Sequence, residues 1–402
     1  MATKPPWPPI DGGRLVALAT LRALAERGHR LRLVAPRDVL DRADDEAEEQ
    51  LSAVCEPLLV PAPPRARLVD VARAQLQRRP LSLVRHERAA VTAGVATALA
   101  SRRPDVVHAE QLQALAATEP ARALGVPRVL RAQNVESDLW RGLAARRRPP
   151  LDLLLRLEAS RLARAEGEAV DRVDATVTLT ADDAARLRRL VSAVGAADAA
   201  IDTVPAPFDA QLEPGPPLAG DPAVVVFGSA GWPPNLDGAR FFVERVWPLV
   251  RRRAPAARLH LFGFGALGAR LSGVERHPAP ADASTALARD SLLAVPLFIG
   301  SGIRMKILEA WARGVPVVAT STAAAGLVAP PSDDPAVLIA DRPEDFAAAL
   351  IEAHRPERRA PLVTAGRAAL EAHSAQRVAA ALEEIYRGAV AGAARTPSLV
   401  AP

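Results

Sequence analysis

The segment 296–316, PLFIGSGIRMKILEAWARGVP, holds residue types that suit the binding of a phosphorylated ligand. Gly300 and Gly302 allow the backbone to approach a ligand closely, and the N-terminal end of the helix expected next attracts phosphate oxygens. Arg304 and Lys306 add positive charge at the same place. This spacing indicates a site for a nucleoside diphosphate.

Lys306 stands out from the composition of the chain. Of 51 lysines and arginines, only Lys4 and Lys306 are lysine, so 49 are arginine. A compact ammonium suits a point contact with a phosphate, and an exposed helix residue is the alternative. Glu309, three residues later, could accept hydrogen bonds from ribose hydroxyls, as acids do in other nucleotide-binding folds.

The run GSGIRMKILEAWARGVPVVAT, followed by AAAGL, resembles the donor-site segment of family 4 (group 1) glycosyltransferases. The resemblance implies the GT-B fold, in which two Rossmann-like domains face each other across a cleft. It also implies sugar transfer from a nucleoside-diphosphate sugar to a hydroxyl acceptor, usually with retention at the anomeric carbon and without a metal. Arg304 and Lys306 would then act catalytically on the leaving diphosphate, with Ser301, Gly302 and Glu309 binding the donor. Many members carry an acid where this chain has Ser301.

Short apolar runs alternate with helical patterns in both halves of the chain, which predicts α/β domains built from parallel βαβ units. The expected strands of the first half are Arg30–Ala35, Glu56–Val60, Asp105–His108, Pro127–Arg131, Ala175–Leu179 and Asp202–Val204. Those of the second half are Ala223–Gly228, Arg258–Gly263, Ser291–Pro296, Val315–Thr320 and Ala336–Ala340. The expected helices include Arg14–Arg27, Leu151–Asp171, Pro343–His354 and Ala375–Ala391.

We predict an acceptor-side domain at 1–205, a proline-rich linker at 206–222 and a nucleotide-sugar donor domain at 223–375. The resemblance implies that the terminal helix, within 376–402, crosses back to the first domain. Near the N-terminus, KPPWPPIDGG resembles the loop that follows a central first strand, yet only three residues precede it. We therefore expect that this strand is missing or truncated.

Gly12 and Gly13 precede the first expected helix, and such a pair allows close approach to an anion. In the resembling family this loop faces the donor phosphates, whereas a simple turn is the alternative. His108 and Glu110 end a buried strand, where ligands gather in open α/β sheets. Glu110 could orient an acceptor hydroxyl or stabilise positive charge on the sugar, and an exposed acid at a strand end is its alternative.

The segment RAQNVE ends another strand and resembles a family segment in which His precedes Asn, a position held here by Gln133. Asn134 and Glu136 are therefore candidate acceptor contacts. Capping of the following helix by Asn134 or Ser137 is the competing interpretation.

The segment VFGSAGWPPN at 226–235 resembles the opening of the donor domain in the same family. It makes Ser229 and Asn235 candidates for donor contact or for helix capping. Gly263 ends the next strand, where the resemblance places the nucleotide base. Relatives often carry an Arg and a Lys in the segment that matches 226–235. This chain has neither there, so we expect Arg304 and Lys306 to bind the diphosphate.

Composition limits the other classes of function. The 402 residues, 49% of them apolar, are enough for two cored domains, and a single Cys55 excludes an internal disulfide framework. No long apolar run or leader is evident, so we expect a cytoplasmic enzyme, with peripheral contact at the inner membrane face. The histidines are scattered in the sequence, and we expect neither a metal nor a cofactor besides the nucleotide-sugar co-substrate. Walker, Rossmann-fingerprint and nucleophile-elbow motifs are absent.

Two alternatives of other classes remain. A degenerate glycosyltransferase would bind a nucleotide sugar or a protein partner without turnover, which the serine at 301 and the missing strand suggest. A basic protein with a net charge of +5 could instead bind nucleic acid or membrane through Arg146–Arg148 and Arg251–Arg253. We do not expect nucleic-acid binding, because aromatic residues are only 3% of the chain and base stacking depends on them.

Overall fold

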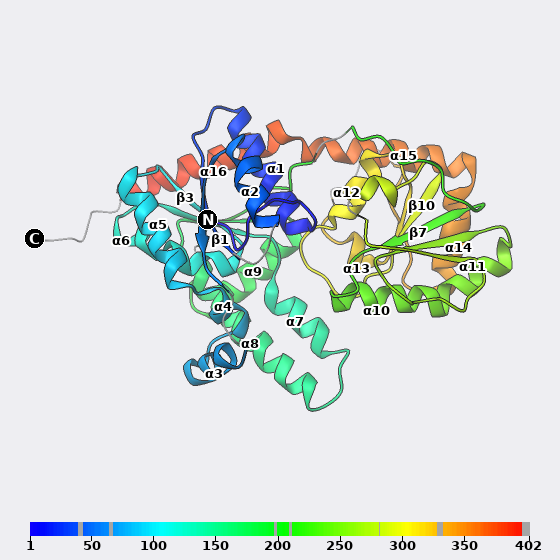
Figure 1. Cartoon of the computed structure of the whole chain (residues 1–402), viewed down its shortest axis with the longest axis horizontal. Helices are drawn as coiled ribbons and strands as arrows, with labels where there is room; N and C mark the ends of the chain where they lie inside the picture. Colours follow the sequence, from blue (N-terminus) through cyan, green and yellow to red (C-terminus); the bar gives the residue numbers. More distant parts are fainter. Residues whose placement is uncertain are drawn as a thin grey trace, which may run out of the picture. The chain divides into compact units, whose positions relative to one another are not determined.

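The computed structural model describes residues 1–38, 43–63, 67–196, 199–208, 211–280, 282–327 and 333–395. The chain divides into two compact α/β units (Figure 1). Unit 1 contains Met1–Pro207 together with Ala375–Pro402, and unit 2 contains Phe208–Ser374. Residues 209–210 of the predicted linker and 396–402 of the predicted tail lie outside the described residues.

The strands of unit 1 form two parallel sheets. β1 (Arg32–Arg37) pairs with β2 (Glu56–Pro61), and the second sheet has the order β3-β4-β5-β6. Its strands are β3 (Val107–Glu110), β4 (Arg128–Ala132), β5 (Ala175–Thr178) and β6 (Ile201–Thr203).

Met1 and Ala2 bridge the two sheets of unit 1. Ala2 N donates to the carbonyl oxygen of Val34 in β1 at 3.0 Å, and the Met1 amino group donates to that of His108 in β3 at 2.8 Å. The two residues thus join β1 to β3 through hydrogen bonds to their backbone. A cavity of about 460 Å³ adjoins them, lined also by residues of α1, β1, β3 and α16.

Helices cover the sheets of unit 1. They are α1 (Gly12–Glu26), α2 (Ala43–Ser52), α3 (Arg67–Gln77), α4 (Leu81–His86), α5 (Ala89–Ser101), α6 (Glu119–Ala123), α7 (Glu136–Ala144), α8 (Leu151–Asp171), α9 (Ala181–Ala193) and α16 (Ala375–Arg395). α16 returns to this unit because Val378, Ala379 and Leu382 pack against Val129 of β4 and Val177 of β5. Burial of this apolar stripe stabilises the helix where it lies.

Unit 2 contains one six-stranded parallel sheet in the order β12-β11-β10-β7-β8-β9. Its strands are β7 (Ala223–Phe227), β8 (Arg258–Phe262), β9 (Val274–His277), β10 (Ser291–Val295), β11 (Val317–Ala319) and β12 (Leu338–Ile339). Its helices are α10 (Pro233–Phe241), α11 (Trp247–Arg253), α12 (Met305–Ala312), α13 (Ser321–Ala324), α14 (Pro343–His354) and α15 (Pro356–Ala369), with a π-helical turn at Phe242–Val246.

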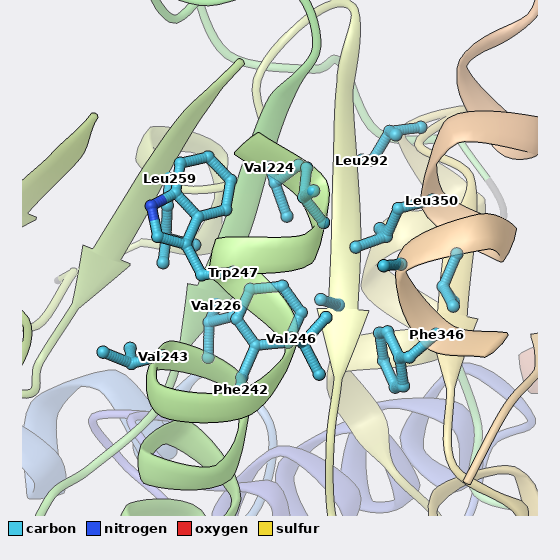
Figure 2. Packing of buried hydrophobic residues seen from close by; sticks show 14 of the residues in the cluster. Val224, Val226, Phe242, Val243, Val246, Trp247, Leu259, Leu292, Phe346 and Leu350 are labelled. Atoms are coloured by element: carbon cyan, nitrogen blue, oxygen red, sulfur yellow. The ribbon is translucent and has the colours of Figure 1, made fainter. Parts of the chain in front are cut away.

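The core of unit 2 lies between the sheet and the helical run 242–250 together with α14. Trp247 and Phe242 pack over Val224 and Leu259 of β7 and β8, with Phe346 of α14 beside Phe242 (Figure 2). These side chains are buried to 1% exposure or less, so the sheet beneath them is held rigidly. A rigid sheet fixes the positions of the turns at its carboxyl edge.

The predicted α/β fold with parallel sheets is confirmed, and each expected strand overlaps an observed one. β9 was missed. Its sequence Val-Glu-Arg-His has one apolar residue and lies at the sheet edge, where one side needs no burial.

Candidate functional site

Lys306 and Asn235 converge at the carboxyl end of β7 in unit 2. Lys306 Nζ donates to the carbonyl oxygen of Phe227 at 2.7 Å and lies 5.0 Å from the centre of the Phe227 ring. A Cβ added to Gly228 would lie 2.9 Å from Asn235 Nδ2 and 3.3 Å from Lys306 Nζ. The glycine therefore keeps space open beside a half-buried ammonium and an amide.

Two further predicted residues shape the turn after β7. Asn235 Nδ2 donates to the carbonyl oxygen of Ser229 at 3.4 Å, and Ser229 Oγ accepts from Gly231 N at 3.2 Å. Gly263 has φ +87°, and a Cβ there would collide with the carbonyl oxygen of Gly228. Only glycine allows the turns after β7 and β8 to come this close.

The glycine turn before α12 folds around Arg304. The Arg304 guanidinium donates to the carbonyl oxygens of Ser301 and, at 2.9 Å, of Gly302. Gly302 has φ +71°, and Gly300 leaves room for the guanidinium because a Cβ there would collide with it. Ser301 is buried, with 4% of its surface exposed. The turn thus presents Arg304 at the start of the helix that carries Lys306.

Burial shifts the pKa values of both titratable groups on α12. Desolvation lowers the pKa of Lys306 to about 8, with the Arg304 charge adding to the effect and Glu309 opposing it. Desolvation raises the pKa of Glu309 to about 7, although Arg313 and Lys306 favour its charged form. Lys306 is therefore mostly charged at neutral pH, and its weakly solvated ammonium is suited to an anionic ligand.

In unit 1, Gly12 and Gly13 lie inside α1, so the expected start of this helix at Arg14 is wrong by two residues. A Cβ on Gly13 would lie 2.9 Å from Gln111 Nε2 and 3.0 Å from Gln133 Oε1. The space above Gly13 is therefore occupied by two glutamine side chains.

His108 and Glu110 belong to a buried polar network. His108 Nε2 lies 3.2 Å from a Glu110 carboxylate oxygen, Gln133 Nε2 donates to the other at 2.7 Å, and His108 Nδ1 lies 2.7 Å from the Tyr386 hydroxyl. Burial alone would raise the pKa of Glu110, but the Arg131 charge and the bonds from His108 and Gln133 lower it to about 2. Glu110 is 8% exposed, so the alternative of an exposed acid at a strand end is wrong.

The start of α7 is capped by a residue that the sequence did not suggest. Its N-cap is Val135, whose side chain makes no cap bond, so the competing interpretation of capping by Asn134 or Ser137 is wrong. Instead, Glu166 Oε1 accepts from the amide of Glu136 at 2.5 Å and Oε2 accepts from that of Ser137 at 3.3 Å. Desolvation raises the pKa of Glu166 to about 8. The only signal was an acid on the apolar face of a long helix.

Two histidines that are far apart in the sequence meet on adjacent strands. His260 Nδ1 lies 3.1 Å from His277 Nε2, and His260 Nε2 donates to the carbonyl oxygen of Ala219 at 2.8 Å. His277 stacks on Phe262, with ring centres 4.2 Å apart. With Glu275 they form a group whose ligand atoms lie within 4.8 Å, donors of the kind that transition metals bind. The two histidines are scattered in the sequence, and the pairing of β8 with β9 brings them together.

Two protein-family models match this chain, one in its first half and one in its second half. A family described as "Glycosyl transferase 4-like domain" matches residues 11–205, and one described as "Glycosyl transferases group 1" matches 221–355. HepE of Anabaena, solved with UDP and glucose, is 14% identical over 95% of this chain and 97% of its own, with a TM-score of 0.64. Sucrose-phosphate synthase of Thermosynechococcus elongatus is 15% identical over 95% and 94%, with a TM-score of 0.68. No curated protein sequence matches this one.

Proposed function

The chain belongs to the group 1 glycosyltransferases and has the GT-B fold, and we propose that it moves a sugar from a nucleoside-diphosphate sugar to a hydroxyl acceptor. The observation that carries the proposal is the position of Lys306. Its ammonium lies half-buried beside the glycine turn that ends β7, on the same short helix as Glu309. Cations preorganised in this way stabilise negative charge as it develops on a leaving diphosphate.

We assign the donor contacts to unit 2. Lys306 and Arg304 hold the diphosphate, and Glu309 accepts hydrogen bonds from the ribose hydroxyls. The backbone groups near Gly263 and Ser301 approach the rest of the nucleotide. Reduced solvation strengthens each of these contacts, which fits the lowered pKa of Lys306 and the raised pKa of Glu309.

Unit 1 contributes the acceptor side in this proposal. Asn134 and Glu136 face the acceptor hydroxyl, and His108 with Glu110 orients the carboxyl edge of β3. Glu110 is buried beside His108, and its lowered pKa makes its carboxylate a weak base. We therefore assign Glu110 the role of holding its neighbours in position and not that of accepting a proton. The reaction retains the anomeric configuration and needs no metal. Its product belongs to a polysaccharide or glycoconjugate made in the cytoplasm, at the inner membrane face.

Calorimetry with UDP and with GDP tests the donor site. We expect one nucleotide to bind the parent protein and binding to weaken at least about tenfold in Lys306→Ala, which loses a charge-assisted contact. Arg252→Ala is the matched control, because Arg252 is an exposed cation at the end of α11 in the same unit. Equal binding by Lys306→Ala and the control would refute the site. Binding without transfer or hydrolysis of any donor sugar would favour the non-catalytic alternative that buried Ser301 suggests.

A further inference from the structure

Two helices of unit 1 expose large apolar side chains to solvent. On α3, Leu68 is 83% exposed and Leu76 is 87% exposed; on α8, Leu153 is 60% exposed and Leu154 is 59% exposed. The set, called here the α3/α8 surface, consists of Leu68, Val69, Leu76, Leu151, Leu153, Leu154 and Leu157. Isolated exposed leucines are ordinary, but a cluster of this kind marks a surface that is covered in use.

A side-chain hydrogen bond links the two helices. Arg161 Nη2 on α8 donates to Gln75 Oε1 on α3 at 3.0 Å, and Figure 1 shows both helices at one end of unit 1. The opposite face of α8 is buried through residues such as Leu162 and Val170. The exposed leucines of α8 thus lie on its outer face, while its inner face packs inside unit 1.

Positive charge is concentrated around these leucines. Residues 67–79 and 146–164 together contain ten arginines and three acids, a formal charge of +7. The whole chain carries +5, so the remaining residues have a net charge of −2. Two of the three acids, Asp70 and Glu158, are buried, and the side chain of the third, Asp152, is 14% exposed. Glu87 and Glu168, outside these ranges, pair with Arg79 and Arg164, and the other eight arginines leave an excess of positive charge beside the leucines.

We propose that the α3/α8 surface docks unit 1 on an anionic lipid bilayer, with the leucines entering the boundary between headgroups and acyl chains. Interfacial helices bind in this way, and arginines near an anionic leaflet add attraction. A second copy of the chain is disfavoured as the occupant, because it would place one +7 surface against another. None of the helices in the described ranges is long and apolar enough to span a bilayer, so docking would be peripheral.

This inference deepens the proposed action at a membrane face and rests on that part of the proposed function. Docking would bring an acceptor whose hydroxyl is carried on a lipid to the unit assigned to the acceptor. It makes no use of the donor residues in unit 2. UDP binding, measured on the same preparations, therefore separates failure of this inference from failure of the transfer proposal.

Sedimentation with phosphatidylcholine vesicles, with and without phosphatidylglycerol, tests the surface. We expect the parent to bind only the vesicles that contain phosphatidylglycerol, and to dissociate as salt rises. Leu153→Ser combined with Leu157→Ser should lower the partition coefficient between vesicles and water at least about tenfold. The serines bury much less apolar surface in the bilayer than the leucines do. Leu124→Ser is the matched control, since Leu124 is 49% exposed in the same unit but outside the surface.

Three results would overturn the inference. The first is no binding to either vesicle by a parent that still binds UDP. The second is equal loss of vesicle binding in the leucine variant and the control. The third is a parent dimer, seen by light scattering, that becomes a monomer in the leucine variant, which would assign the surface to a second copy of the chain.

Discussion

Above neutral pH, the parent protein should take up a proton when it binds a nucleoside diphosphate. Replacing Lys306 by methionine should abolish this proton uptake. Burial lowers the pKa of Lys306 to about 8, so the free site loses its charge as the pH rises through this value. A bound diphosphate favours the charged ammonium and raises that pKa again. Affinity for the diphosphate should therefore fall above about pH 8, and binding there should be accompanied by proton uptake.

The expected proton uptake follows from the pKa of Lys306, and the expected change in Kd follows from the strength of one charge-assisted hydrogen bond. At about pH 9 a lysine with a pKa of about 8 is roughly nine-tenths neutral, so binding should take up ~0.9 proton. Loss of one charge-assisted hydrogen bond costs ~1.5–3 kcal/mol, so at neutral pH, where Lys306 is charged, the Kd of UDP for Lys306→Met should exceed that of the parent roughly 10- to 150-fold. Calorimetry in two buffers of different ionisation enthalpy measures both quantities.

The comparison requires a variant that changes charge without touching the site. Arg252→Ala removes an exposed cation from α11 and should keep the parent's affinity and proton uptake. If Lys306→Met takes up as many protons as the parent and binds UDP equally well, Lys306 does not contact the diphosphate and the reasoning is wrong.

Three other predictions concern groups whose burial or backbone geometry is unusual. Burial raises the pKa of Glu309 to about 7, so if its carboxylate holds the ribose, UDP affinity should fall below that pH in the parent but stay level in Glu309→Gln, as calorimetry across pH would record. Gly263→Ala should lower the free energy of unfolding by at least ~2 kcal/mol in denaturant titrations, because φ is +87° and the Cβ meets the carbonyl oxygen of Gly228; Gly265→Ala, with φ +56° and open space, should cost about 1 kcal/mol. Burial raises the pKa of Glu166 to about 8, so the folded state binds a proton that the unfolded state releases near the ordinary glutamate pKa of 4.5. Stability should therefore fall as the pH rises between these values, and Glu166→Gln should flatten that slope in melting curves; an unchanged slope would contradict the assignment.

Local pattern was enough to predict most of the fold. Central strands such as Ser291–Val295 and Ala223–Phe227 are continuous apolar runs, because both faces of a parallel sheet are buried. The helix 151–171 follows from its periodicity and matches its predicted bounds. β9 could not be found in this way, because an edge strand with one apolar residue has no pattern that distinguishes it from a loop.

Some candidate residues were visible because their chemistry is contiguous. Gly302, Arg304 and Lys306 lie within five consecutive residues, so their proximity needs only a turn and a helix. Pairings across the fold were not visible. The contacts of Lys306 with Phe227 and of His260 with His277 depend on which strands are neighbours in the order β12-β11-β10-β7-β8-β9.

The sequence by itself determined the element types, the two α/β halves and a basic glycine turn before a helix. Only the tertiary structure decided that Glu110 is buried in an ion network and that Glu166 caps α7. It also decided that burial lowers the pKa of Lys306 to about 8. The physical reason is that helix and strand propensity act over a few neighbouring residues, whereas desolvation and hydrogen-bond partners come from segments that meet only after the chain has packed.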